Sequence, residues 1–262
     1  MKDNLIKPEW IRLAKENLSW LMYFVLILVS WYFLRNDVVK MDEFVHMRQI
    51  TGLSSGNFQH DPFLTTVKGF HWIMAGLHYL TDSIASLRLL NAMFGFASVL
   101  IFLGCWRIVS PNSEEARVWQ FAFLPILLPY SFLVYTDTLA LTIVMLGFYF
   151  CLRQKYLLGI LILVLSMGVR QNSIIWLLAA PTFAWCFHNP DFYRLTRLLS
   201  LEAWKDYALK TWPVVIGVLV FAAFLYINKG VALGDQGAHP PFLLHLGNVF
   251  FFLLVYLLFS CR

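Results

Sequence analysis

The chain has 262 residues, of which 60% are hydrophobic and only 13% are charged. Soluble domains carry roughly 25% charged residues, so this composition excludes an ordinary water-soluble protein and indicates a membrane protein. The formal net charge of +5 does not indicate nucleic-acid binding, because the basic residues are scattered between apolar runs without a stripe or a known binding motif.

Apolar runs follow one another along the chain, and several approach the roughly 20 residues that a spanning helix needs. The run at 69–80 is short and contains His71 and His78, so we interpret it as an in-plane or re-entrant helix. The sequence predicts an all-α polytopic membrane protein with that helix and about eight spans, over residues 19–34, 85–106, 118–135, 138–152, 157–169, 172–187, 211–227 and 241–260. No repeat or low-complexity tract divides it, so residues 1–262 are expected to form a single transmembrane domain.

The basic residues predict which segments share a side of the membrane. One side carries thirteen of the twenty Lys and Arg residues, on the N-terminus, 107–117, 153–155, 188–210 and the C-terminus. The positive-inside rule places this side in the cytosol. The polar segments 35–84, 135–138, 169–172 and 228–241 then lie on the opposite, lumenal or extracellular side. We expect them to share one cavity, with the candidate active site in the loop 35–84.

The segment MDEFVHMRQI, residues 41–50, concentrates charge directly after an apolar run. If it is helical, Asp42, His46 and Gln49 lie on one face and Glu43 points elsewhere. A carboxylate oriented by polar neighbours in a partly dry cleft is suited to general-base work on a sugar hydroxyl. A solvated loop of mixed charge remains an alternative. A divalent-metal site on Asp42 and His46 is a weaker one, because a third ligand at suitable spacing is missing.

Two isolated charges and one polar loop complete the candidates. Arg170 interrupts apolar sequence, and a guanidinium matches phosphate oxygens, although an arginine reaching the headgroups explains it too. Asp137 is a candidate of the same kind or a simple helix cap. The loop HDPFLTTVKG, residues 60–69, offers hydrogen-bonding groups to a hydroxylated ligand, or is a plain polar loop.

Several motifs in this order resemble those of the dolichyl-phosphate-glucose α-1,2-glucosyltransferase family of the endoplasmic reticulum, which adds the terminal glucose to the lipid-linked oligosaccharide. The motifs, between residues 41 and 239, are MDEFVHMRQ, HDPFLTT, LRLLN, LPYSFLVYTD, VRQNSIIW and NKGVALGDQGAH. The family usually has Trp at the position of His60, and prolines at those of Val67 and Lys68. Its members are about twice as long, so the resemblance implies a short or truncated member that lacks C-terminal spans.

The resemblance implies a fold and a reaction. The fold is the multi-spanning GT-C type, and the active face is lumenal in the endoplasmic reticulum membrane. The implied donor is dolichyl phosphate glucose and the acceptor is the diglucosylated oligosaccharide on dolichyl diphosphate, with inversion at the anomeric carbon. No cofactor and no metal is implied. Partners would be these substrates and membrane lipid, with no nucleic acid.

Position and resemblance together assign the roles. Asp42 or Glu43 is the expected base, and Arg170 is expected to hold the donor phosphate. The remaining expected substrate-binding residues are His46, Gln49, Asp61, Thr65, Thr66, Asp137, Gln171, Asn172, Asp235 and His239. The alternative function is a catalytically inactive membrane protein that binds or regulates other membrane subunits, such as a channel or a transporter.

Overall fold

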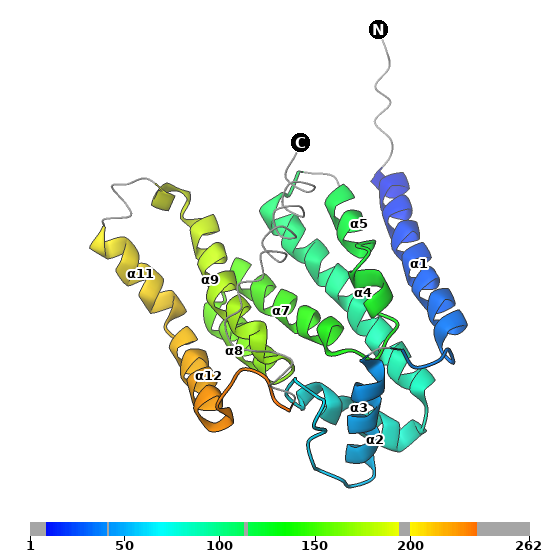
Figure 1. The fold of residues 1–262 in the computed structure, drawn as a ribbon. Coiled ribbons are helices and arrows are strands. Elements are labelled where there is room, and N and C mark those ends of the chain that lie inside the picture. The colour runs from blue at the N-terminus through cyan, green and yellow to red at the C-terminus, as the bar shows by residue number, and fades with distance from the viewer. Residues whose placement is uncertain (1–8, 41, 113–114, 194–199, 235–262) are drawn as a thin grey trace.

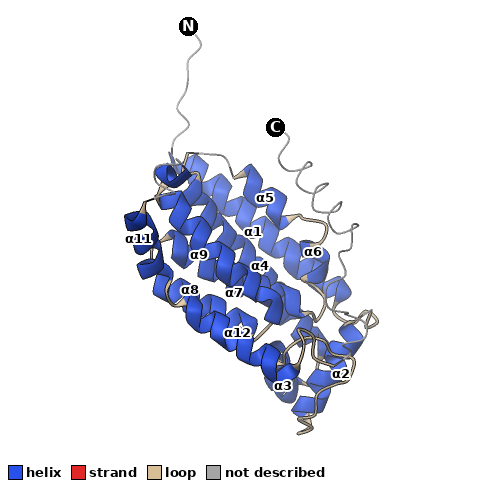
Figure 2. Cartoon of the chain, turned by 60° about the vertical axis from the view of Figure 1, so that its left-hand side comes forward, coloured by secondary structure: helices blue, strands red, loops and turns tan. Residues whose placement is uncertain are grey.

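The computed structural model describes residues 9–40, 42–112, 115–193 and 200–234, which form helices and loops without a strand (Figure 1; Figure 2). The all-α prediction is confirmed for this part of the chain. Asp235, His239 and the apolar run at 241–260 lie outside the described residues. The α-helices are α1 Glu9–Leu34, α2 Glu43–Ser54, α3 Gly69–Thr81, α4 Ile84–Val109, α5 Ala116–Ala122, α6 Leu127–Tyr130, α7 Thr136–Leu152, α8 Tyr156–Met167, α9 Ile174–His188, α11 Leu201–Thr211 and α12 Val214–Asn228.

The predicted number of membrane-spanning helices is not confirmed by the described part of the chain. Within the described residues, α4 is the one helix that is long and apolar enough to cross a membrane by itself. Helices α11 and α12 pass the same test together, but they are bent by 63° at the break between them. The described part of the chain therefore holds one or two candidate spans, and the predicted eight are not confirmed.

The predicted span at 118–135 is wrong as a single helix. It consists of the short helices α5 and α6. Pro125 lies between them and Pro129 lies inside α6. Proline lacks an N–H group and its ring clashes with the preceding turn, so two prolines four residues apart prevent a long helix here. The runs at 138–152, 157–169, 172–187 and 211–227 do form helices, of 17, 12, 15 and 15 residues.

Helix α7 is central, and it packs against α4 on one side and α8 on the other (Figure 1). Glycines allow the close approach of α7 and α8. A Cβ atom built on Gly147 would lie 2.9 Å from the Gly159 carbonyl oxygen, and one built on Gly159 would lie 2.7 Å from the Gly147 oxygen. Small residues at facing positions are the usual means by which helices of apolar proteins approach closely.

Helices α2 and α3 form a separate layer at one end of the bundle, beside the end of α1 (Figure 1). Helix α3 coincides with the run at 69–80 that was predicted to be helical, and α2 shows that most of the segment 41–50 is helical too. The inner side of α3 buries Phe70, His71 and Met74, whereas Tyr79 and Leu80 are exposed. This inner side packs with Ile50, Leu87, Val134 and Val169 into one core cluster. The layer is therefore held against α4, α7 and the turn before residue 170. That α3 lies in the membrane plane stays a prediction.

Candidate active site

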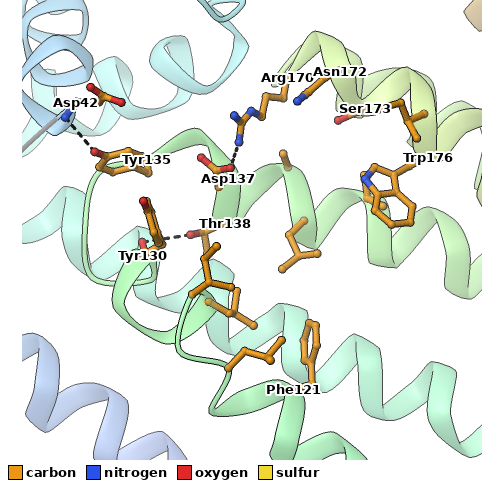
Figure 3. Close-up of a pocket in the computed structure, with 17 residues that line it drawn as sticks. Asp42, Phe121, Tyr130, Tyr135, Asp137, Thr138, Arg170, Asn172, Ser173 and Trp176 are labelled. Carbon is orange, nitrogen blue, oxygen red and sulfur yellow. Dashed lines mark hydrogen bonds and ion pairs between the residues drawn. The ribbon is translucent and has the colours of Figure 1, made fainter. Parts of the chain in front are cut away.

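A cavity of about 590 Å³ lies between the N-terminus of α2, the segment around α6, α7 and the start of α9 (Figure 3). Its polar wall is near the start of α7 and includes Asp42, Tyr130, Tyr135, Asp137, Thr138, Arg170, Asn172 and Ser173. Its apolar wall is formed by Phe121, Leu124, Ile126, Leu127, Ala140, Leu141, Val144, Ile175 and Trp176. The same cavity thus has charged groups at the start of α7 and apolar side chains about two turns further along this helix.

Asp42 is held at the cavity wall by its backbone. It is the residue immediately before α2, and its N–H group donates a 3.0 Å hydrogen bond to the phenol oxygen of Tyr135. The Tyr135 ring also packs edge-on against the His46 ring, 5.2 Å away. Asp42 itself makes no side-chain cap to the helix. Its carboxylate lines the cavity, as expected for a base that acts on a bound ligand.

Glu43, the neighbouring carboxylate, lies outside the cavity. Its side chain is fully buried, and its oxygens accept hydrogen bonds from the Arg88 guanidinium at 3.0 and 2.7 Å and from the Val134 N–H at 2.9 Å. Arg88 also donates to the carbonyls of Leu34 and Asp37. A buried carboxylate with these partners connects α2 to α4 and to the segment before α7, and it is not available to a ligand in the cavity. Of the two expected bases, only Asp42 faces the cavity.

His46 and Gln49 do not line the cavity either. His46 Nδ1 lies 2.8 Å from His71 Nε2, and both rings are buried. Burial lowers the pKa of His46 to about 4 and that of His71 to about 3, so both are neutral at physiological pH. The Gln49 amide donates to the Gln59 carbonyl and accepts from the Asp61 N–H. The face shared by Asp42, His46 and Gln49 therefore packs mainly against protein.

The loop residues Asp61, Thr65 and Thr66 also lie outside the cavity. The Asp61 carboxylate makes a two-point pair with Arg48, whose Nη2 donates at 2.7 Å. Partial burial opposes ionisation, but this hydrogen bond lowers the pKa of Asp61 below its usual value. Thr65 contributes its carbonyl to the Gln171 amide, and the Thr66 side chain is buried. The structure assigns these groups to holding the loop, and none of them lines the cavity.

Arg170 and Asp137 face each other across the polar end of the cavity and form an ion pair (Figure 3). Asp137 lies in the first turn of α7, where the structure shows no side-chain cap to the helix. Burial lowers the pKa of Arg170, yet a guanidinium stays protonated at neutral pH. Arg170 lines the cavity, and its role as a phosphate ligand stays a prediction.

The turn that carries Arg170 is braced by its neighbours. The Gln171 amide donates to the carbonyls of Thr65 at 2.7 Å and Val231 at 3.0 Å, and accepts from the Val67 N–H. The Gly69 N–H donates to the Gly168 carbonyl at 3.0 Å, and a Cβ atom on Gly69 would lie 2.0 Å from that oxygen. Gln171 therefore supports the turn, while Asn172 lines the cavity.

The cavity thus brings together four of the expected residues, Asp42, Asp137, Arg170 and Asn172. Sequence reasoning missed Tyr130 and Tyr135, although both belong to the segment LPYSFLVYTD that precedes Asp137. It also missed Arg88. This residue could have been noticed as the one arginine near the start of an apolar helix.

These features define a helical, strongly apolar protein with a site suited to an amphiphile. The DIE2/ALG10 family model matches residues 37–189 and 188–262, and the chain belongs to this family.

Several curated proteins named Dol-P-Glc:Glc(2)Man(9)GlcNAc(2)-PP-Dol alpha-1,2-glucosyltransferase are similar to it. The Homo sapiens protein is 24% identical over 279 residues, covering 84% of this chain and 56% of its own length. The Mus musculus protein is 25% identical over 261 residues, covering 81% and 55%. The Candida albicans protein is 23% identical over 279 residues, covering 92% and 60%. The chain therefore spans a little more than half the length of these relatives. No solved structure matches it.

Proposed function

We propose that the chain is an inverting glucosyltransferase that moves glucose from dolichyl phosphate glucose to the diglucosylated, dolichyl-diphosphate-linked oligosaccharide. The single observation that carries this proposal is the cavity that combines Asp42, Arg170 and an apolar wall. The names of the relatives supply the sugar, the α-1,2 linkage and the acceptor. The location that goes with them is the endoplasmic reticulum membrane, with the cavity on the lumenal side.

The cavity suits a lipid phosphate donor. A guanidinium binds phosphate oxygens through charge-assisted hydrogen bonds, so we assign the donor phosphate to Arg170. The isoprenoid next to the phosphate then lies along Leu141, Val144, Ile175 and Trp176. A volume of about 590 Å³ lies within the usual range for ligand pockets, so it accommodates the sugar phosphate and the first isoprene units.

The reaction follows from two groups. The Asp42 carboxylate accepts the proton of the acceptor hydroxyl as its oxygen attacks the anomeric carbon from the side opposite the phosphate. The bond between that carbon and the phosphate oxygen breaks, and its electron pair leaves with dolichyl phosphate. Arg170 stabilises the charge that develops on the phosphate. This scheme requires neither a cofactor nor a metal.

The test is glucose transfer by the chain expressed in microsomes that lack the terminal glucosyltransferase. We expect labelled glucose to pass from dolichyl phosphate glucose to the diglucosylated acceptor. Asp42→Asn should lower the rate at least 100-fold, because an amide does not accept the proton. The matched control is Asp82→Asn, whose side chain is 96% exposed and outside the cavity. Full transfer by Asp42→Asn would exclude the mechanism.

Association with other membrane subunits is the second candidate. Within the described part of the chain α12 packs against α8 and α9, and Gly217 is its one buried residue, so most of its side chains are exposed there or half-buried. Native gel electrophoresis of the mildly solubilised chain distinguishes the two. A discrete larger complex together with absent glucose transfer would favour this second function.

A further inference from the structure

The polar end of the cavity carries more negative than positive side chains, which is unexpected for a site that holds phosphate. Its lining includes three ionisable carboxylate or guanidinium side chains, the anions Asp42 and Asp137 and the cation Arg170. The cation faces one of the anions directly, because Arg170 Nη1 pairs with Asp137 Oδ1 (Figure 3). A bound phosphate therefore meets a cation that another anion already partly neutralises.

Asp137 has no role in the transfer reaction described above, yet it is placed to act on the phosphate. It projects from the first turn of α7 and remains 46% exposed, beside an Arg170 side chain that is 31% exposed. A guanidinium carries five N–H donors, so one carboxylate does not exhaust its capacity. A phosphate at Arg170 is thus held by the remaining donors, with the Asp137 charge close to its oxygens.

The charge of the lipid phosphate changes during the reaction. The donor is a phosphodiester with one negative charge. The spent lipid is a phosphomonoester, whose second pKa is about 6, so it carries nearly two negative charges at neutral pH. An arginine alone would hold this product more tightly than the donor, and the product would block the site.

We propose that Asp137 is a specificity residue, which makes the cavity discriminate against phosphomonoester lipid and so favours release of the spent carrier. Each negative charge added to the phosphate is repelled by Asp137, so the doubly charged product is penalised about twice as much as the singly charged donor. Asp137 weakens donor binding as well, but by less than it weakens product binding. This inference rests on the proposed function, because it requires a lipid phosphate at Arg170.

The experiment measures equilibrium binding to the purified, detergent-solubilised chain and does not depend on catalysis. The probes are radiolabelled farnesyl phosphate, a monoester, and its methyl ester, a diester, at pH 7.5. The variants are Asp137→Asn and Asp137→Ser, which remove the charge, and Asp137→Glu, which keeps it. Asp82→Asn is the matched control, because it removes an exposed carboxylate far along the chain from the cavity lining.

We expect Asp137→Asn to tighten diester binding about tenfold, which lies between the roughly fourfold effect that Coulomb's law gives in bulk water and the more than hundredfold effect that it gives near a protein surface, for charges roughly 5 Å apart. Monoester binding should tighten about a hundredfold, so the ratio of the two dissociation constants changes about tenfold. Asp137→Glu and Asp82→Asn should keep the ratio of the unsubstituted chain. If Asp137→Asn does not fold, Asp137→Ser gives the same comparison.

Two results would overturn the inference in different ways. An unchanged ratio in both neutral variants, with the unsubstituted chain binding the probes, would remove the role of Asp137 and leave the proposed function standing. Failure of the unsubstituted chain to bind either probe, while it elutes as a folded species, would remove the phosphate from Arg170 and with it the proposed function.

Discussion

The adjacent carboxylates Asp42 and Glu43 have different surroundings, although a single peptide bond separates them. Asp42 lines the cavity, whereas Glu43 is fully buried against Arg88. Two neighbouring residues hold the start of α2. The Val134 N–H donates a hydrogen bond to the Glu43 carboxylate, and the Tyr135 phenol oxygen accepts one from the Asp42 N–H. The two contacts set the N-terminus of α2 at a defined place beside α7.

Sequence reasoning at this scale identified the region but not the partners. Charge and spacing pointed to residues 41–50 and to Arg170, and the structure places Asp42 and Arg170 on one cavity wall, whereas their roles as base and phosphate ligand stay predictions. The choice between Asp42 and Glu43 was not predictable, because it depends on Arg88, which is 45 residues away in the chain. Gln49 and Gln171 were predicted to bind substrate. In the structure their side-chain amides are hydrogen-bonded to backbone groups of Asp61 and Thr65, and sequence alone does not reveal these contacts between distant segments.

Tyr135 is expected to position the proposed base. Tyr135→Phe keeps the ring but removes the oxygen that accepts the Asp42 N–H bond. We expect kcat for glucose transfer to fall about tenfold with little change in KM, because a small misplacement of a base lowers the rate steeply. Hydrogen exchange of the peptide spanning residues 41–46 should become faster.

Tyr32→Phe is the matched control for this variant, because Tyr32 lies near the end of α1 and outside the cavity. Unchanged kcat and unchanged exchange in Tyr135→Phe would show that the hydrogen bond does not position Asp42.

Among the elements, hydropathy predicted where helices occur better than how long they are. Each of the runs at 138–152, 157–169 and 172–187 contains a helix, but each is shorter than a span. The break at 118–135 was readable from Pro125 and Pro129, and apolar content alone concealed it. The bend between α11 and α12 falls at Trp212 and Pro213, where a new helix begins.

The contact between α7 and α8 should be sensitive to a single methyl group. In Gly147→Ala the new Cβ atom would lie 2.6 Å from Leu163 Cγ and 2.9 Å from the Gly159 oxygen, so the two helices must separate. We expect a loss of about 1–3 kcal/mol in the free energy of unfolding, the usual cost of overpacking. Thermal unfolding in detergent measures it.

Gly76→Ala supplies the comparison, since a Cβ atom on Gly76 meets nothing within 4 Å. This variant should be neutral or more stable, because alanine is the better helix former. Equal stability of the two variants would contradict the close packing of α7 on α8.

For the molecule as a whole, composition indicated a helical membrane protein, and the described residues are all-helical and include one or two candidate spans. The span count could not be derived, because the described bundle packs the two long helices α1 and α4, of 26 residues each, together with several helices of 17 residues or fewer. The assignment of the α2 and α3 layer to the lumenal side rests on the distribution of basic residues and stays a prediction.

The stability of the folded chain should fall in mild acid. The folded pKa values of His46 and His71 are about 4 and 3, below the ordinary value of 6.5. Above about pH 6.5 the two histidines are neutral in both the folded and the unfolded chain, so they do not change the stability there. Below it the unfolded chain binds protons that the folded chain excludes, so stability declines by about 1.4 kcal/mol per pH unit for each histidine.

The decline should extend from about pH 6.5 to the folded pKa values, and thermal unfolding between pH 7.5 and 4.5 follows it. A double variant, His46→Asn with His71→Asn, should show a shallower decline over the same range. The same slope in the double variant would assign the acid sensitivity to other groups.

The most direct test of the account is to locate the donor in the cavity by photo-crosslinking. The probe is a short-chain polyprenyl phosphate glucose with a diazirine on its second isoprene unit, bound to the purified chain and mapped by mass spectrometry. We predict labelling of residues 140–144 and 175–176 on the apolar wall, reduced by Arg170→Gln and by excess unlabelled donor. Labelling confined to α1 or α12, unaffected by Arg170→Gln, would contradict the assignment of this cavity to the lipid phosphate sugar.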